Sequence, residues 1–212
     1  LIMGSQEVKE GYKLTEVGVI PEDWEVKKLG DIAEIATGNT PNTKDYTNYG
    51  DEFLFVSPVD LGNHKYIFST EKKLSSKGFS QARVFPVYSI LFTCIGSTIG
   101  KIGIASQILT SNQQINAIFP NESYKTNFLF YILSYLAPQI KASASEQAVP
   151  ILNKSAFSKV LVNYPPLHEQ EKIAQVLSDF DSAIAHLDKL ISKKRNVKQG
   201  TMQQLLTGKK RL

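Results

Sequence analysis

Near its C-terminus the chain carries an apolar repeat that limits what this segment can fold into. Large apolar side chains recur at spacings of 4, 3, 4, 3 and 4 between residues 173 and 191, and no proline or glycine interrupts residues 167–199. This is the a/d rhythm of a coiled-coil helix. The predicted seam consists of Ile173, Leu177, Phe180, Ile184, Leu187, Ile191 and, after a polar interruption, Leu205.

A helix over His168 to Leu206 spans about 60 Å at about 1.5 Å per residue. Such a helix is stable in water only when another surface covers its apolar stripe, and no other segment of the chain is long enough to cover it. The repeat therefore predicts dimerisation, or pairing with a similar helix of another chain. The alternative is a helix that folds back on its own domain. Gly200 is expected to bend or fray the last turns.

The residues before this helix favour a strand-rich domain. Short runs of Val, Ile, Phe and Tyr alternate with turn-forming residues between residues 53 and 119, which is typical of strands. Strands are predicted at 24–26, 53–56, 84–87, 89–95, 101–105, 114–119 and 160–164. Helices are predicted at 32–35, capped by Gly30 and Asp31, at 154–158, and from Asn127 to Leu136, where Pro138 stops the helix.

The sequence thus predicts an α+β fold, in which a strand-rich globular domain is followed by one long C-terminal coiled-coil helix. The Pro165-Pro166 pair interrupts the chain between these two parts. We expect an N-terminal extension at residues 1–11, in part a cloning remnant, then a globular domain at 12–164 and a helical region at 165–212.

The composition excludes several classes of protein. With 42% hydrophobic and 21% charged residues, the chain is typical of a core-forming globular protein rather than a disordered one. The single cysteine, Cys94, allows no internal disulfide, and no apolar run approaches the roughly 20 residues that cross a bilayer. Because the start of the chain has no signal-peptide pattern, we expect a cytoplasmic protein without a membrane partner.

Charge is distributed unevenly along the chain. Residues 1–34 carry 4 basic and 8 acidic side chains, residues 35–165 carry 11 and 7, and residues 166–212 carry 9 and 5. A basic body with a basic tail suits a polyanion such as DNA, although many proteins with this balance bind no nucleic acid.

A glycine-rich stretch from Gly96 to Lys101 invites comparison with the phosphate-binding Walker A loop. That loop needs four residues between its glycines and a Ser or Thr after the lysine, whereas only three residues separate Gly96 from Gly100 and Ile102 follows Lys101. ATP binding is therefore not expected. The stretch lies between two predicted strands and is interpreted as a hairpin connection, either a simple turn or a tip that presents polar groups to nucleic acid.

A set of short motifs, in the order found in this chain, resembles the specificity (S) subunit of Type I restriction-modification systems. The strongest are the Pro-Pro-Leu-x-Glu-Gln junction at 165–170 and the Met-Gln-Gln-Leu-Leu ending at 202–206. The others are Gly18-x-Ile20-Pro21-x-Asp23-Trp24, Thr37-Gly38-x-Thr40-Pro41, Gly96-x-x-Ile99-Gly100-Lys101-Ile102-Gly103 and Asn112-Gln113-Gln114-Ile115.

The resemblance implies a target recognition domain at residues 12–164 and a conserved helical region at 165–212. Members of this family usually hold two such units in tandem, with their helices antiparallel. Each domain reads one half of a bipartite double-stranded DNA site, and the helices recruit two methyltransferase subunits and, indirectly, the restriction subunit. This chain has one unit, so we expect an antiparallel homodimer that reads an inverted repeat with an unread gap.

The side chains expected to contact DNA follow from the chemistry of base and phosphate recognition. Asn and Gln bond adenine in the major groove, Lys bonds guanine or phosphate, and Ser and Thr suit either base or backbone. The candidate base or backbone contacts are Asn39, Thr40, Lys44, Tyr46, Ser97, Thr98, Lys101, Gln113 and Gln114. The candidate phosphate anchors are Lys65, Lys72, Lys73 and Arg83.

No catalytic group, metal site or cofactor is predicted in this chain. His64, His168 and His186 lack metal-ligand spacing, and Cys94 has no CxxC partner. The Gly-x-Ser-x-Gly elbow of acyl transfer is absent, as is the glycine-rich loop of an S-adenosylmethionine-using enzyme. We therefore expect a non-catalytic subunit whose partners supply the chemistry.

Two other functions stay open from the sequence alone. One is a coiled-coil adaptor that binds other proteins, which the equal numbers of basic and acidic residues over 1–165, 15 of each, would suit. The other is a DNA specificity subunit of a bifunctional restriction enzyme of a different type.

Overall fold

The computed structural model describes residues 8–144 and 150–212, so residues 1–7 of the expected N-terminal extension lie outside it. The chain divides into two compact units, Leu1–Glu171 and Lys172–Leu212. The first unit is a strand-rich α+β domain, and the second consists of most of helix α5 (Leu167–Leu206) and a short tail. The predicted fold class is confirmed.

The first sheet of the domain is buried on both faces. All four residues of its central strand, β10 (Ile90–Thr93), are buried. Ile90 and Phe92 point into the apolar cluster on one face of the sheet, and Leu91 points into the cluster on the other face. Burial on both sides explains why this strand is a continuous apolar run without alternation. The strand order is β4 (Ile35–Thr37), β13 (Ile115–Ile118), β10 (Ile90–Thr93), β11 (Ile102–Ala105) and β7 (Tyr66–Ile67).

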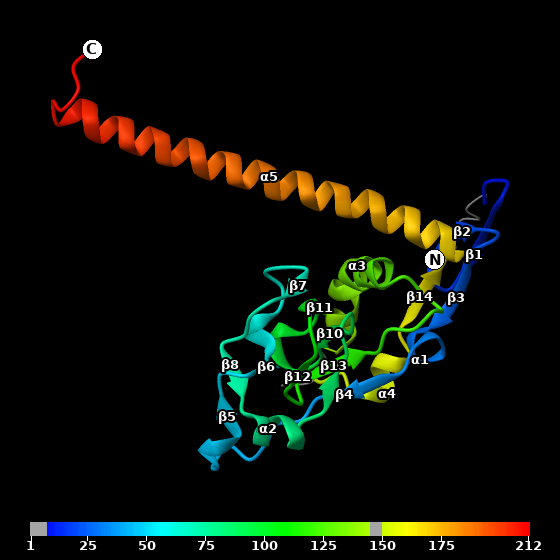
Figure 1. Ribbon diagram of the computed structural model, residues 1–212. Coiled ribbons are helices and arrows are strands. Elements are labelled where there is room, and N and C mark those ends of the chain that lie inside the picture. The colour runs from blue at the N-terminus through cyan, green and yellow to red at the C-terminus, as the bar shows by residue number, and fades with distance from the viewer. Residues whose placement is uncertain (1–7, 145–149) are drawn as a thin grey trace. The chain divides into compact units, whose positions relative to one another are not determined.

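The second sheet covers one face of the first, and the longest helix of the domain, α3 (Thr126–Ala144), covers the other (Figure 1). Leu54 and Leu109 of the second sheet pack against the first sheet, whereas Leu129 and Leu133 of α3 pack on its opposite face. The order of the second sheet is β5 (Tyr49–Gly50), β8 (Lys72–Leu74), β6 (Phe53–Val56), β12 (Leu109–Ser111) and β9 (Val84–Phe85).

Two antiparallel strand pairs and several short elements complete the domain. The pairs are β1 (Tyr12–Thr15) with β2 (Gly18–Pro21), and β3 (Glu25–Lys28) with β14 (Leu161–Tyr164). The short helices are α1 (Leu29–Ile32), α2 (Ser76–Gln81) and α4 (Lys154–Ser158), and the 3-10 turns are η1 (Tyr46–Asn48), η2 (Pro58–Asp60) and η3 (Gly96–Thr98).

Most strands and one short helix predicted from the sequence are present, with ends shifted by one or two residues. Strands β6, β10, β11, β13 and β14 match their predictions, and α4 begins after an Asn153 cap whose side chain accepts from the Ala156 N–H. Gly96 and Gly100 connect the antiparallel strands β10 and β11 and have φ values of 78° and 97°, which explains why glycine occupies both positions. The predicted hairpin is confirmed.

Two predicted helix boundaries are wrong. Helix α1 begins at Leu29 after Lys28 rather than at a Gly30-Asp31 cap, and Ile35 belongs to strand β4, where it pairs with Ile118. The helix expected over 127–136 is α3, which starts at Thr126 and continues through Pro138 to Ala144. Asn127 does not cap this helix but accepts a hydrogen bond from the Tyr66 hydroxyl.

Continuation beyond Pro138 has a packing explanation. Proline inside a helix costs about 3 kcal/mol because it removes one backbone N–H and crowds the preceding turn. Ile140, one half-turn later, is buried in the same cluster as Leu133, and full burial of such a side chain contributes roughly 1.5–3 kcal/mol. The core contact thus offsets a large part of the local penalty.

Helix α5 has 40 residues and passes through Gly200 without a break, which confirms the long predicted helix. Its seam side chains from Leu177 to Ile191 are 38–64% exposed, and the second unit contains no other element that packs on them. The helix ends with Gly208 at a φ of 71°, whose N–H bonds the Leu205 carbonyl. No helix in the described ranges is long and apolar enough to cross a membrane.

Candidate nucleic-acid interface

The loop at residues 38–45 is held in one shape by contacts with distant segments. The Asn39 side chain donates to the Gln81 carbonyl at 2.8 Å and accepts from the Arg83 N–H at 2.5 Å. The Arg83 guanidinium in turn donates to the Thr37 carbonyl at 2.6 Å. These bonds join the start of the loop to the end of α2, so Asn39 and Arg83 lie on one surface.

A third segment, the turn between β12 and β13, joins the same surface. The Thr40 hydroxyl donates to Gln113 Oε1 at 2.6 Å, and Asn112 Nδ2 donates to Gln114 Oε1 at 3.0 Å. Gln113 is exposed, and the bond from Thr40 holds its amide by the oxygen. Three segments that are far apart in the sequence thus present amide and hydroxyl groups side by side, as base-edge recognition requires.

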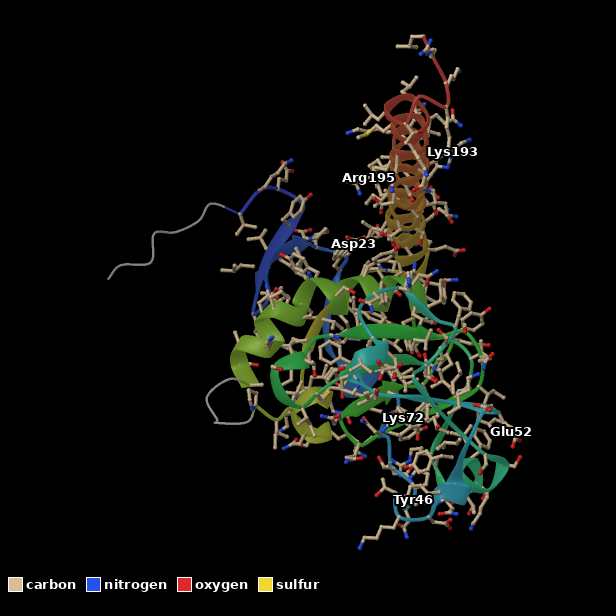
Figure 2. All side chains as sticks on the ribbon, turned by 90° about the vertical axis from the view of Figure 1, so that its left-hand side faces the viewer. Asp23, Tyr46, Glu52, Lys72, Lys193 and Arg195 are labelled. Atoms are coloured by element: carbon tan, nitrogen blue, oxygen red, sulfur yellow. The ribbon has the colours of Figure 1, made fainter. Side chains whose placement is uncertain are left out.

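Farther along the loop an open groove of about 400 Å³ lies between η1, β5 and β8. Tyr46 stands at this groove with 85% of its surface exposed, and Lys72 and Lys73 lie on the strand that forms the opposite side. Figure 2 shows Tyr46 and Lys72 toward the same end of the domain. The groove is lined by Thr43, Tyr46, Tyr49, Gly50, Glu71, Lys72 and Lys73.

A local ion pair shapes the turn that carries Tyr46. Lys77 donates to Asp45 at 2.7 Å, and the same carboxylate accepts from the Thr47 hydroxyl and backbone N–H. The hydrogen bond from Lys77, followed by those from Thr47, lowers the pKa of Asp45 to about 2. Asp45 therefore stays ionised throughout the neutral range and fixes the 3-10 turn that exposes Tyr46.

The remaining predicted contact residues lie apart from this surface, on the side of the domain near α3. Lys101 donates to the Pro58 carbonyl at 3.1 Å, and Lys65 donates to the Tyr131 hydroxyl at 2.9 Å with its ammonium 4.3 Å from the ring centre. The Ser97 carbonyl accepts from Lys141, and the Thr98 hydroxyl bonds the Ile95 carbonyl. Both lysines thus make contacts inside the domain.

The structure therefore divides the predicted residues into two groups. Asn39, Thr40, Arg83, Gln113 and Gln114 meet at one surface. Tyr46, Lys72 and Lys73 line the groove, and the exposed Lys44 follows the lining residue Thr43 in the chain. We call these nine residues the polar face. The sequence analysis did not identify three residues that shape this face: Gln81, Tyr49 and Lys77. The only feature of the sequence that could have pointed to them is that each lies near a predicted contact residue in the chain.

A second cluster anchors the start of α5 to the domain. The Gln170 side chain is fully buried, accepts from the Lys125 N–H at 2.9 Å and donates to the Pro165 carbonyl at 2.9 Å. The indole of Trp24 donates to Glu169 at 2.8 Å. The Pro-Pro-Leu-x-Glu-Gln junction and the Trp24 motif are thus two halves of one anchoring cluster.

We expect Gln170→Ala to lower the free energy of unfolding by about 2–3 kcal/mol, because it leaves the Lys125 N–H and the Pro165 carbonyl without partners. Urea denaturation of the full chain measures this change. Gln175→Ala, at an exposed glutamine of the same helix, serves as the matched control and is expected to stay within about 0.5 kcal/mol. Equal effects of the two substitutions would contradict the anchoring role.

The one cysteine has the properties of a core residue. Cys94 is 3% exposed, and burial raises the pKa of its thiol to about 12. The Asn116 amide donates to its sulfur at 3.2 Å. Within residues 8–144 and 150–212, no group of three or more His, Cys, Asp or Glu side chains is placed to hold a metal ion.

Comparison with known proteins places this architecture in a family. The model of the Type I restriction modification DNA specificity domain matches residues 21–194. The chain belongs to this family. The match covers the polar face, the anchoring cluster and the apolar part of the α5 seam.

Relatives within the family match most of this chain but are longer. The chain is 35% identical over 184 residues to the Type I restriction enzyme MjaIX specificity subunit of Methanocaldococcus jannaschii, covering 84% of this chain and 42% of the relative. It is 32% identical over 151 residues to the HindI specificity subunit of Haemophilus influenzae, covering 69% of this chain and 33% of the relative. The chain thus spans less than half of each.

The fold is also shared with a solved structure. The HsdS subunit from Thermoanaerobacter tengcongensis superposes with a TM-score of 0.64 at 19% identity, over 92% of this chain and 47% of that one. The likeness extends over both the domain and α5, so the combination of a strand-rich domain and a long helix is a property of this fold.

Proposed function

We propose that this chain is a sequence-specific DNA recognition subunit of a Type I restriction-modification complex and reads one half of a bipartite site. The observation that carries the proposal is the polar face, where amide and hydroxyl groups from three segments meet in a chain of the specificity family. Methyl transfer and cleavage are assigned to methyltransferase and restriction subunits, which this chain recruits.

The polar face supplies both kinds of DNA contact. Gln113 and Gln114 lie beside Thr40, where amide groups can bond base edges in the major groove. Lys44 and Lys72 are exposed cations at and beside the groove, suited to phosphate contacts that orient the domain on the duplex. Tyr46 offers an exposed ring at the groove that can pack against the deoxyribose of the DNA backbone.

The two kinds of contact predict different effects of substitution. Lys72→Ala is expected to weaken binding to all duplexes equally and to reduce the slope of log K against log salt concentration by about one. Gln113→Ala is expected to relax preference at one base position by about 1–3 kcal/mol and to leave the salt slope unchanged. Lys101→Ala, whose ammonium bonds the Pro58 carbonyl, is the control and should leave both quantities unchanged.

Filter binding of labelled duplexes across a salt series, with the methyltransferase subunit present, measures these effects. Failure of the complete complex to bind any duplex above a protein-only background would contradict DNA recognition. It would favour the adaptor function instead.

We further propose that two copies pair through α5. The seam side chains Leu177, Phe180 and Ile184 are 38%, 64% and 58% exposed, an apolar surface that a second helix would cover. A seam with this heptad spacing is typical of a two-helix contact.

The charges along α5 favour an antiparallel pair. Residues 167–188 carry five acidic side chains and one lysine, whereas residues 189–212 carry eight basic side chains and no acidic one. A parallel pair would place like charges together, and an antiparallel pair places the acidic half of one helix beside the basic half of the other. Two identical domains related by this two-fold axis would read an inverted repeat.

A further inference from the structure

The seam residues select one register for the proposed antiparallel pair. When Ile173 lies opposite Ile191, Leu177 lies opposite Leu187 and Phe180 opposite Ile184, so each apolar seam residue of this stretch has an apolar partner. Ala183, on the flank of the seam, then meets its own copy at the two-fold axis, and its small side chain permits close approach.

The neighbouring registers cover the seam less well. A shift of one heptad in one direction places Lys194 and Lys198 opposite Leu177 and Ile173. A shift in the other direction leaves Leu187 and Ile191 without apolar partners. The chosen register brings the Asp181 side chains of the two copies to the same side of the two-fold axis. The repulsion between these two carboxylates is small compared with the apolar contacts that the register completes.

This register brings the basic part of α5 to the start of the partner helix. Lys193 and Lys194 come level with residues 171 and 170 of the other copy, where the anchoring cluster lies. Figure 2 shows Lys193 and Arg195 on the C-terminal part of α5. Lys194, Arg195 and Lys198 border a shallow groove of about 360 Å³ on α5, together with Leu190 and Ile191.

The surface that these lysines would meet carries exposed carboxylates, and two lysines bond residues of it: Lys13 donates to the Glu22 carbonyl at 2.7 Å, and Lys125 pairs with Glu171 at 3.1 Å. Trp24 is fixed to Glu169 by its indole hydrogen bond, and the preceding residues Glu22 and Asp23 are exposed. In heptad terms Glu169 lies on the flank of the seam that also carries Lys193 in the other copy, and Lys194 continues the seam itself. We call Glu22, Asp23 and Glu169 the acidic root.

From this complementarity we propose that Lys193 and Lys194 dock on the acidic root of a second copy of this chain and thereby fix the register of the dimer. The inference rests on the proposed pairing through α5. In this register about thirty helical residues, or about 45 Å, separate the two points at which a domain joins its helix. This separation is shorter than the full helix, which is about 60 Å long. The docking therefore sets the separation of the two DNA-reading domains.

Charge reversal tests this contact in the full chain. We expect Lys193→Glu with Lys194→Glu, or Glu22→Lys with Asp23→Lys, to weaken dimerisation about 10-fold each at low salt, because the two-fold axis repeats each contact. The four substitutions together are expected to restore the wild-type dissociation constant within about 3-fold. Lys44→Glu with Lys72→Glu makes the same charge change on the polar face and should have little effect on the dissociation constant of the dimer.

The outcomes separate this inference from the proposed dimer. Losses that add instead of compensating, in a chain that does dimerise, would overturn the docking contact alone. A wild-type chain that remains monomeric at every concentration would overturn both the contact and the pairing through α5.

A distance measurement tests the register independently. A nitroxide label on Ser192→Cys is expected to give a separation of about 30 Å along the helix axis, because residue 192 lies ten residues from the two-fold axis. The native Cys94 is buried and does not compete for the label. A slip of one heptad changes the distance by about 10 Å, and a parallel pair brings the labels within about 15 Å; either result would overturn the proposed register.

Discussion

Leu187→Asp is expected to convert the proposed dimer into a monomer, with the dissociation constant raised by about 1,000-fold. In the proposed register Leu187 packs against Leu177 of the partner, and the two-fold axis repeats the contact. Removing each apolar contact costs roughly 1.5–3 kcal/mol of binding free energy. A loss of about 1.4 kcal/mol corresponds to a tenfold increase in the dissociation constant. The introduced carboxylate adds a charge to a surface that pairing would bury.

The mass of the particle in solution, measured over a range of concentrations, checks this expectation. Asn196→Asp introduces the same charge on the opposite side of α5 and is the matched control, expected to leave the dimer intact. If Leu187→Asp left the mass unchanged at concentrations where the wild type is dimeric, the seam would not be the contact surface. The pairing would then have to be assigned elsewhere.

Gly38→Ala is expected to lower the free energy of unfolding by about 3 kcal/mol, and the midpoint of thermal unfolding by about 6–12 °C. A Cβ at this position would lie 2.2 Å from the Ser111 hydroxyl and 2.4 Å from the carbonyl oxygens of Ser111 and Asn112. Two of these atoms belong to the backbone, so the clash moves the loop that carries Asn39 and Thr40 away from the β12–β13 turn.

Calorimetry of the full chain measures the stability change, and filter binding measures the accompanying loss of DNA affinity. Gly200→Ala is the control, because a Cβ there meets no atom within 4 Å and alanine favours the helix by about 0.5–1 kcal/mol. A Gly38→Ala protein as stable as the wild type would show that the close approach at this loop is not required.

The parts of the fold that were predicted correctly are those in which a local pattern and the tertiary environment agree. The heptad repeat of α5 extends over many turns, so its period is clear without any knowledge of a partner. Strand β10 is a short, buried apolar run, and its neighbours in the sequence are turn formers. Such segments need no long-range information to be recognised.

Other features depend on contacts that the sequence does not display. Strands β5 and β7 have two residues each, too few to show a period. Helix α3 passes through Pro138 because residues beyond the proline, such as Ile140, are drawn into the core. In each case tertiary packing decides what local propensity leaves open.

The candidate site was predictable in its residue types but not in its grouping. Asn39 and Lys101 have equally suitable chemistry, and both bond a carbonyl within the domain. Only the structure shows that Asn39 joins the polar face whereas Lys101 lies apart from it. The bond between Asn39 and Arg83 spans 44 residues, and that between Trp24 and Glu169 spans 145. Contacts at such separations come from the topology of the sheets, which no single motif encodes.

The proposed arrangement of two DNA-reading domains at a set distance is tested most directly by selecting bound sequences from a randomised duplex library. The selection uses the complex of this chain with the proposed methyltransferase partner. We expect the selected sites to be inverted repeats whose half-sites are separated by one constant, unread gap, with centres about one to two helical turns apart. An asymmetric site, or half-sites at variable spacing, would contradict this arrangement.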